Sequence, residues 1–247
     1  MLFIPKLKRI LPFISALFFA FFCIPAFALQ TASGSECVIL LHGLARTSSS
    51  MEKMEKKMID QGFDVINVDY PSRHKKIEEL TDIAVNEGLD FCRNLESSVT
   101  HFVTHSLGGI LVRYYLSNNT IPELGRVVML APPNQGSNVV ETFSQLPGYE
   151  MLNGPAGYQL GKDENSIPLQ LGPANFEVGI IAGDSTINLI LSTSFDEPND
   201  GKVAVEDTKL EGMKDFLVVH HSHPFIMDSD DVIKQVLYFL QQGYFER

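Results

Sequence analysis

Short, continuous apolar runs recur along the chain, and turn-forming or polar residues such as glycine, proline and histidine follow them. Runs of this kind are typical of strands that are buried on both faces of a parallel sheet. Between several of them, apolar residues recur three and four positions apart, which predicts amphipathic helices. We therefore expect an α/β fold in which helices cover both faces of a mostly parallel sheet. The predicted strands cover residues 37–41, 65–69, 101–104, 127–130, 178–182 and 216–219.

The helical spacing is clearest in three stretches. Residues 77–95 and 232–240 repeat apolar positions at the spacing of one helix face, and a methionine face runs through residues 51–58. Ahead of that face, Ser49 followed by Glu52 matches a capping box and predicts that a helix begins there. A methionine stripe at helical spacing is typical of a core face and predicts no binding function.

The most informative stretch is residues 99–111, which read V-T-H-F-V-T-H-S-L-G-G-I-L. An apolar run ends at Ser106, two glycines follow, and a helix-like pattern begins. This arrangement predicts a sharp strand-to-helix turn that projects the serine hydroxyl out of the fold. Such a turn crowds the backbone, so we expect Gly108 and Gly109 to provide the room that it needs.

The stretch matches the pattern G-x-S-x-G with one departure, because Thr104 stands where the first glycine is usual. The start of a helix also leaves backbone N–H groups free, and that of Leu107 would point at developing negative charge. The sequence therefore predicts that Ser106 is a nucleophile. The alternative is that Ser106 merely caps the helix, as serine often does.

Other candidate residues also follow predicted strand ends. His42, Ser106 and Pro132 each come directly after a strand, and the carboxyl ends of parallel strands meet at one edge of a sheet. After the first strand, the backbone N–H of Leu44 is a candidate second donor to an oxyanion. Arg46 follows closely and either contacts a charged group of a substrate or is an ordinary surface arginine, which we regard as the simpler interpretation.

A serine nucleophile needs a base. His220, His221 and His223 follow the last predicted strand. We favour His223, because it lies far enough beyond the strand to sit on a loop ahead of the terminal helix; His220 is the next choice. His105, beside the candidate nucleophile, is expected to pack behind the site.

The base in turn needs an acid that orients it. Asp200 lies in the turn-forming stretch Glu197-Pro198-Asn199-Asp200-Gly201, and it gives the chain order serine, aspartate, histidine. The alternative for that stretch is an ordinary turn. Asp184, which directly follows a predicted strand, is the second candidate for the acid.

Taken together, these residues resemble the α/β-hydrolase superfamily, and within it bacterial lipases and lipase-like esterases. The resemblance implies an α/β-hydrolase fold. It also favours Asp200 over Asp184, because such lipases place the acid in an Asn-Asp-Gly-x-Val stretch and the base further along, which suits His223. The matching stretches are Leu41-His42-Gly43-Leu44, Thr104-His105-Ser106-Leu107-Gly108-Gly109, Ala131-Pro132-Pro133, Gly136-Ser137, Asn199-Asp200-Gly201-Lys202-Val203 and Ser222-His223.

The implied function is hydrolysis of carboxylic esters, lipid or other acyl esters, through an acyl-enzyme. Ser106 would attack, His223 would carry the proton, Asp200 would orient the imidazole, and the N–H groups of Leu44 and Leu107 would hold the oxyanion. No cofactor and no metal ion are expected. Two alternatives remain: an acyltransferase that uses the same three residues, and a binding protein without catalysis.

The first 28 residues are expected to be a signal peptide. Basic residues precede an apolar stretch over residues 10–27, and Ala26-Phe27-Ala28 has the small-x-small pattern of a cleavage site. The alternative is an uncleaved membrane anchor, although the stretch is short for one and contains two prolines. Cleavage would leave residues 29–247 as a single domain, periplasmic or secreted, with no stable membrane span.

The charge of the chain excludes one class of partner. The chain carries a formal net charge of −11, and loss of the three basic leader residues makes it −14, which argues against nucleic acid as a partner.

Cys37 and Cys92 could pair in an oxidising compartment, or remain two buried thiols. Residues 139–171 are rich in Gly, Pro, Leu and Asn without a clear period, so they are a candidate cap or lid; the alternative is a plain surface loop.

Overall fold

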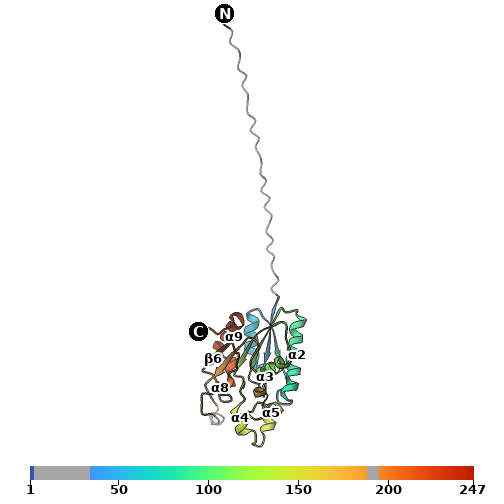
Figure 1. Cartoon of the computed structure of the whole chain (residues 1–247), viewed down its shortest axis with the longest axis vertical. Coiled ribbons are helices and arrows are strands. Elements are labelled where there is room, and N and C mark those ends of the chain that lie inside the picture. The colour runs from blue at the N-terminus through green and yellow to red at the C-terminus, as the bar shows by residue number, and fades with distance from the viewer. Residues whose placement is uncertain (3–33, 188–194) are drawn as a thin grey trace. The chain divides into compact units, whose positions relative to one another are not determined.

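Six parallel strands form one sheet in the part of the chain that the structure describes, in the order β2-β1-β3-β4-β5-β6 (Figure 1). The prediction of an α/β fold with a mostly parallel sheet is confirmed. The strands are β1 (Glu36–Leu41), β2 (Asp64–Val68), β3 (Val99–His105), β4 (Leu124–Leu130), β5 (Val178–Gly183) and β6 (Asp215–Val219).

The computed structural model describes residues 1–2, 34–187 and 195–247. Residues 33–247 belong to one unit and residues 1–32 to another. All but the first two residues of the predicted signal peptide, together with its cleavage site, lie outside the described residues.

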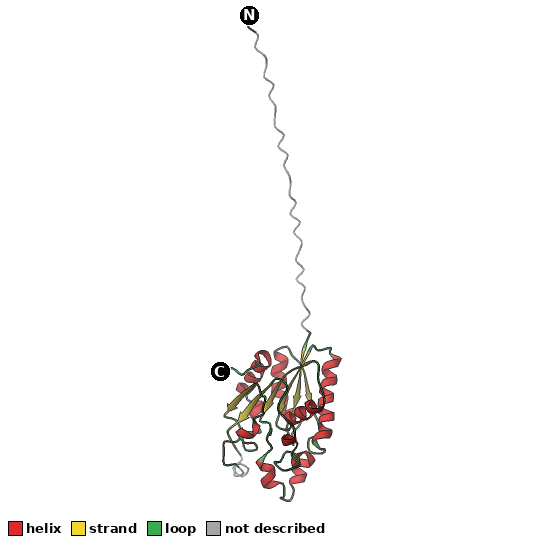
Figure 2. Ribbon diagram, in the orientation of Figure 1, coloured by secondary structure: helices red, strands yellow, loops and turns green. Residues whose placement is uncertain are grey.

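Helices lie on both faces of the sheet, as the sequence predicts (Figure 2). Helices α2 and α3 pack on one face, and α1 and α9 pack on the other. Further short helices follow β4 and β5. The helices and 3₁₀ turns are η1 (Ser48–Met51), α1 (Glu52–Asp60), α2 (Ile77–Asn94), α3 (Leu107–Asn118), α4 (Asn138–Phe143), α5 (Tyr149–Tyr158), α6 (Ile167–Gln170), α8 (Val205–Thr208), η2 (Ile226–Asp228) and α9 (Asp230–Gln242).

Strand β1 shows why the apolar runs are continuous. Its side chains alternate between the two layers: Ile39 and Leu41 face the layer of α2, whereas Val38 and Leu40 face the layer of α1 and α9. All four side chains are fully buried. A central strand covered on both faces has no polar face, so its sequence does not alternate.

The predicted capping box is wrong. Helix α1 begins at Glu52, but the 3₁₀ turn η1 precedes it, and Ser49 pairs its hydroxyl with that of Thr47 (2.8 Å) instead of capping α1. Asp69 accepts the N–H of Ser48 (2.9 Å), so a carboxylate from the loop after β2 satisfies this end of the turn. A tertiary contact has replaced the local one that the sequence pattern suggests.

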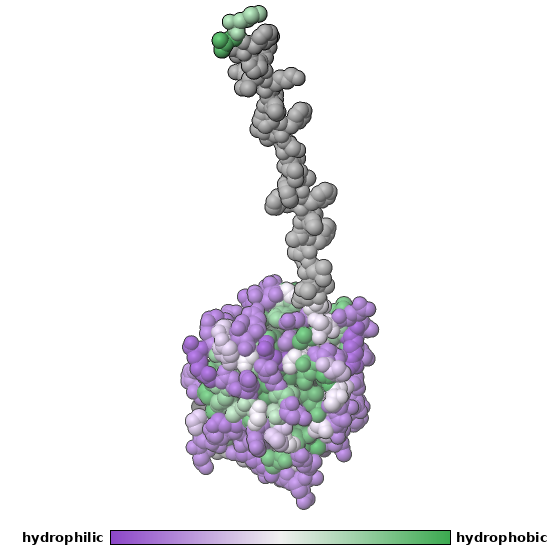
Figure 3. Space-filling model, turned by 45° about the horizontal axis from the view of Figure 1, so that its top comes forward, coloured by the Kyte–Doolittle hydropathy of each residue, from purple (hydrophilic) through white to green (hydrophobic). Residues whose placement is uncertain are grey.

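The face in Figure 3 is mostly hydrophilic, with small hydrophobic areas between charged and polar residues. Larger exposed apolar side chains include Leu146, Met151 and Leu152, in and beside α5. None of the described helices is both long enough and apolar enough to span a membrane.

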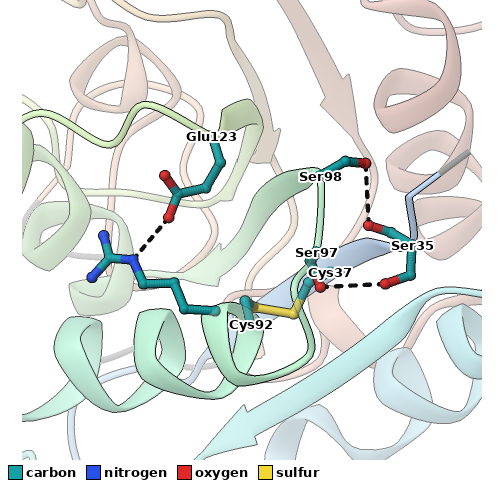
Figure 4. The surroundings of a disulfide bond; sticks show 7 residues. Ser35, Cys37, Cys92, Ser97, Ser98 and Glu123 are labelled. Carbon is teal, nitrogen blue, oxygen red and sulfur yellow. Dashed lines mark hydrogen bonds and ion pairs between the residues drawn. A yellow bond between two sulfur atoms is a disulfide. The ribbon is translucent and has the colours of Figure 1, made fainter.

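Cys37 and Cys92 form a disulfide, with their Cα atoms 5.7 Å apart (Figure 4). The bond joins the start of β1 to the last turn of α2. Beside it, the backbone N–H of Ser98 donates to the carbonyl of Ser35 (3.0 Å), so the segments flanking both elements are also paired. Of the two possibilities that the sequence leaves open, the structure has the bridge.

The double variant Cys37→Ala/Cys92→Ala is expected to be less stable by about 4 kcal/mol, because the bridge closes a long loop in the unfolded chain. The sequence separation is 55 residues. For a domain of this size, the melting temperature should fall by about 8–16 °C. Thermal unfolding followed by circular dichroism measures this. Reductant should lower the melting temperature of the wild type and leave that of the double variant unchanged; equal melting temperatures for both proteins without reductant would contradict the prediction.

Candidate active site

A cavity of about 620 Å³ opens at the carboxyl edge of the sheet. Its lining comes from the loop after β1, the turn after β3, the segment after β4 with α4 and α5, and the loops that carry Asp200 and His223. They include the ends of β1, β3 and β4, which the sequence places along one rim. Ser106 lines the cavity and is 7% exposed.

Ser106 occupies the turn between β3 and α3 in an unusual backbone conformation, with φ 53° and ψ −116°. Residues other than glycine rarely adopt positive φ, and when they do the strain is typically found at functional sites. The turn is held by the Ser106 N–H, which donates to the carbonyl of Leu130 (2.8 Å). Although Ser106 occupies the N-cap position of α3, its side chain makes no capping bond, so the capping interpretation does not account for it.

Glycine is needed at position 108 because the helix starts against β1. A Cβ there would lie 2.6 Å from the carbonyl oxygen of Leu41. Thr104, which replaces the usual first glycine, is fully buried. Its hydroxyl would lie 3.2 Å from a Cβ at position 109, so the absence of a side chain at Gly109 makes room for the threonine. The threonine is therefore compatible with a tight turn.

Ser106, His223 and Asp200 form a continuous chain of hydrogen bonds. His223 Nε2 lies 3.1 Å from Ser106 Oγ, and His223 Nδ1 lies 2.7 Å from Asp200 Oδ2. A carboxylate only accepts, so Nδ1 carries the proton and Nε2 can accept from the serine hydroxyl. His223 is 4% exposed and Asp200 1%. The fold brings together the three side chains that the sequence singles out.

The acid and the base are also fixed through their backbones. Asp200 Oδ1 accepts the N–H groups of Lys202 (2.9 Å) and Val203 (2.8 Å), and the Asp200 carbonyl accepts the N–H of His223 (3.0 Å). His105 Nε2 lies 3.1 Å from the carbonyl of His223, to which it donates. Both loops are thus held rigidly around the imidazole.

His105 lies behind the candidate base, as expected, and also reaches the cavity wall. Burial is the main cause that lowers the pKa of His105 well below its ordinary value, and electrostatic interactions with His223, Arg46 and Lys202 act in the same direction. A neutral His105 places no second positive charge beside an imidazole that must accept a proton.

The second candidates for base and acid pair with each other elsewhere. His220 Nδ1 lies 2.8 Å from Asp184 Oδ1, and the His220 side chain is 84% exposed. His221 pairs with Asp231. None of these four residues lines the cavity.

The loop after β1 presents a free donor beside Ser106. The Ala45 N–H donates to Ser72 Oγ (3.1 Å), whereas the N–H groups of Leu44 and Leu107 find no acceptor among the described residues. A Cβ on Gly43 would lie 3.3 Å from Ser106 Cβ, so the loop passes very close to the serine. Two free N–H groups flanking a buried hydroxyl can stabilise an oxyanion.

His42 braces this loop. Its ring stacks on Tyr70, with centroids 4.0 Å apart, and its Nε2 accepts the Tyr70 N–H (3.3 Å). Nδ1 donates to the carbonyl of Gly43 (2.9 Å), and the Tyr70 hydroxyl donates to the His42 carbonyl. Burial lowers the pKa of His42, so the brace is neutral. Tyr70 therefore helps to hold the loop after β1, and no sequence motif identifies this role.

Residues 139–171 supply much of the apolar wall. Helix α4 contributes Val140 and Phe143, and α5 contributes Tyr149 and Leu152. At its far end the segment is anchored by Arg113 of α3, whose guanidinium donates to the carbonyls of residues 168, 171 and 172. That the segment acts as a cap or lid stays a prediction.

Two residues that the sequence motifs do not mark as binding residues line the cavity. Arg46, interpreted as a surface residue, lines the cavity and donates to the carbonyl of Pro224 (3.3 Å), next to His223. Lys202, not considered as a binding residue, lines it as well. Its place two residues after Asp200 is the signal that could have identified it. In the described ranges, no three His, Cys, Asp or Glu side chains are grouped so that they could hold a metal ion.

No protein-family model and no curated protein sequence matches this chain. Several solved structures, however, are similar to this chain. The mature form of a Bacillus licheniformis lipase superposes with a TM-score of 0.64 and 18% identity, over 85% of this chain and 93% of the lipase. A thermophilic esterase from Thermogutta terrifontis superposes with a TM-score of 0.57 and 15% identity, over 85% of this chain and 92% of the esterase.

A phospholipase from Legionella pneumophila is similar over a shorter part, with a TM-score of 0.58 and 15% identity over 71% of this chain. The match spans 46% of that larger protein. At such identities the likeness concerns the fold and not the activity. Together with the parallel sheet and its strand order, it shows that the chain has the α/β-hydrolase fold, as the sequence motifs imply.

Proposed function

We propose that the protein is a serine hydrolase that cleaves carboxylic esters through an acyl-enzyme. The observation that carries the proposal is the hydrogen-bonded chain from Ser106 Oγ through His223 to Asp200, at the wall of an otherwise largely apolar cavity. The lipases and esterases that share the fold support the same reaction class.

In the first half of the proposed reaction, Ser106 Oγ attacks the ester carbonyl carbon while His223 Nε2 takes the serine proton. The C–O bond to the alcohol then breaks, and His223 returns the proton to the departing oxygen. In the second half, water attacks the acyl-enzyme by the same route and releases the acid. Asp200 keeps the proton on Nδ1 throughout and stabilises the imidazolium.

The N–H groups of Leu44 and Leu107 are the proposed oxyanion donors. They are free in the described residues, and one of them begins α3, where helix geometry leaves N–H groups without partners. Removing one donor of this kind typically costs about 10²–10³ in rate. The apolar walls from α4 and α5 would receive the acyl chain, so this segment is the proposed cap that sets chain length.

We also propose a periplasmic or secreted location after removal of residues 1–28. The basic and apolar leader supports it. The disulfide between Cys37 and Cys92 supports it independently, because such bonds persist in oxidising compartments.

The test uses a fluorophosphonate probe and a series of 4-nitrophenyl esters of increasing acyl length. The wild type is expected to react with one equivalent of probe at Ser106, mapped by peptide mass spectrometry, and to hydrolyse the esters. Ser137→Ala is the matched control, because Ser137 lines the same cavity and is also 7% exposed but has no neighbouring histidine bond. This variant should be labelled as the wild type is.

Labelling at another serine, or no labelling and no turnover, would overturn the proposal and favour a binding protein. An acyltransferase would be labelled too. It is distinguished by adding an alcohol acceptor, because transfer yields a new ester where hydrolysis yields free acid.

A further inference from the structure

Positive charge is concentrated in the cavity of a strongly acidic chain. The chain has a formal net charge of −11, yet Arg46, Arg73 and Lys202 all line the cavity. Among the described lining residues the one acidic side chain is Asp200, and both of its oxygens are engaged by His223, Lys202 and Val203 through hydrogen bonds. The described lining therefore offers cations and no carboxylate that is free to pair with them.

Arg46 and Lys202 have no ion-pair partner among the described residues, whereas Arg126 and Lys162 each pair with a carboxylate. The Arg46 guanidinium donates to the Pro224 carbonyl, a neutral acceptor. Lys202 is half-buried, and burial, followed by the charge of Arg46, lowers the pKa of its ammonium. Holding two cations close together, one of them partly desolvated, is unfavourable unless an anion joins them.

Two hydrogen bonds of the Lys202 backbone fix the position of this residue. Its N–H donates to Asp200 Oδ1 (2.9 Å), and its carbonyl accepts the hydroxyl of Ser137 (2.8 Å). Arg46 is placed by the loop that contains Ala45, whose φ is 58°. Arg46 therefore lies in the loop that carries the proposed oxyanion donor Leu44, and Lys202 lies in the loop that carries Asp200.

Arg46 and Lys202 lie beside the proposed base, whereas Arg73, the third cation of the lining, belongs to the segment after β2, whose backbone packs against Gly154 of α5. Arg46 contacts the residue that follows His223, and Lys202 is two residues beyond Asp200. In the proposed reaction His223 protonates the departing alcohol, so that alcohol lies on this side of Ser106. The apolar side chains of α4 and α5 form the other part of the lining and suit an acyl chain.

We propose that the preferred substrate is an ester whose alcohol part carries a phosphate or a carboxylate, and that Arg46 and Lys202 bind this anion. The inference rests on the proposed ester hydrolysis and adds the chemistry of the leaving group. Guanidinium and ammonium groups give charge-assisted hydrogen bonds to such oxygens, which are stronger than bonds between neutral groups.

The test compares three esters that share one octanoyl chain: 1-octanoylglycerol, 1-octanoylglycerol 3-phosphate and the octanoyl ester of glyceric acid. Release of octanoate gives kcat/KM for each. The wild type is expected to favour at least one anionic ester over the neutral one by about 10- to 100-fold. A preference for only the phosphate or only the carboxylate identifies the anion and supports the proposal.

In Arg46→Gln/Lys202→Gln the ratio between anionic and neutral ester should fall to near one. Lys57→Gln is the charge-matched control, because Lys57 lies exposed on α1 outside the cavity, and it should keep the wild-type ratio. Hydrolysis of all three esters at similar rates by the wild type, or a preference that survives in the double variant, would overturn the inference and leave the proposed ester hydrolysis intact.

A measurement on the wild type alone covers the case in which the double variant fails to fold. Glycerol 3-phosphate should inhibit hydrolysis of the neutral ester competitively, glycerol should not, and added salt should weaken the inhibition. Equal effects of the two compounds would count against the inference. Absence of turnover on every ester, together with absence of fluorophosphonate labelling, would instead remove the proposed function itself.

Discussion

Replacing Ser106 with alanine is expected to lower kcat for ester hydrolysis by about 10⁶-fold, because the variant lacks the atom that forms the acyl-enzyme. The fold should tolerate the change. Alanine occurs with positive φ elsewhere in this chain, at Ala45 (58°) and Ala131 (48°), and the side chain of Ser106 caps no helix. The melting temperature should therefore stay close to that of the wild type.

The same experiment tests whether the residues act as a unit. His223→Ala alone should be nearly as inactive as Ser106→Ala, and the double variant should be no worse than either, because each single change already stops the covalent route. Rates are measured with the best 4-nitrophenyl ester, against protein purified in parallel. Retention of a tenth or more of the wild-type kcat by Ser106→Ala would contradict the assignment of the nucleophile.

The framework of this fold could be predicted from the sequence because burial on both faces of a parallel sheet leaves a strong local signal. The apolar run at β1 and the pattern around Ser106 need no knowledge of the rest of the chain. The carboxyl ends of parallel strands meet at one edge of the sheet, so the loops that directly follow the strands are expected to lie close together. The α/β-hydrolase resemblance follows from the same residues.

The choice among three clustered histidines was harder, because His220, His221 and His223 lie within four residues of one another. The structure separates them by burial: His220 bonds to Asp184 at an exposed position, whereas His223 is buried against Ser106. Burial of a loop residue depends on what packs over it, and periodicity carries no information about that.

Features that depend on distant contacts were missed or left open. The bridge between Cys37 and Cys92 needs α2 to end beside the start of β1. The capping box at Ser49 failed because Asp69, from another loop, binds the end of the turn instead. Arg46 looked like a surface residue, since nothing in its neighbours along the chain shows that it faces a cavity with Lys202.

Replacing Asp200 with asparagine is expected to lower kcat by about 10⁴-fold while changing the fold little. The amide oxygen can keep accepting the N–H groups of Lys202 and Val203, which now bind Oδ1. The amide nitrogen then faces His223 Nδ1 and, being a donor, forces Nδ1 to accept. The imidazole proton moves to Nε2, which can no longer accept the proton of Ser106.

Asp184→Asn is the matched control, because Asp184 directly follows β5 and also pairs with a histidine, His220. It should retain wild-type kcat, since His220 is exposed and lies outside the cavity lining. Steady-state kinetics on both variants, with KM determined separately, decides between the two carboxylates. Loss of activity in Asp184→Asn with an active Asp200→Asn would transfer the role of the acid to Asp184. Loss in Asp200→Asn alone, with KM little changed, would show that the buried carboxylate acts by fixing the tautomer of His223 and not by binding substrate.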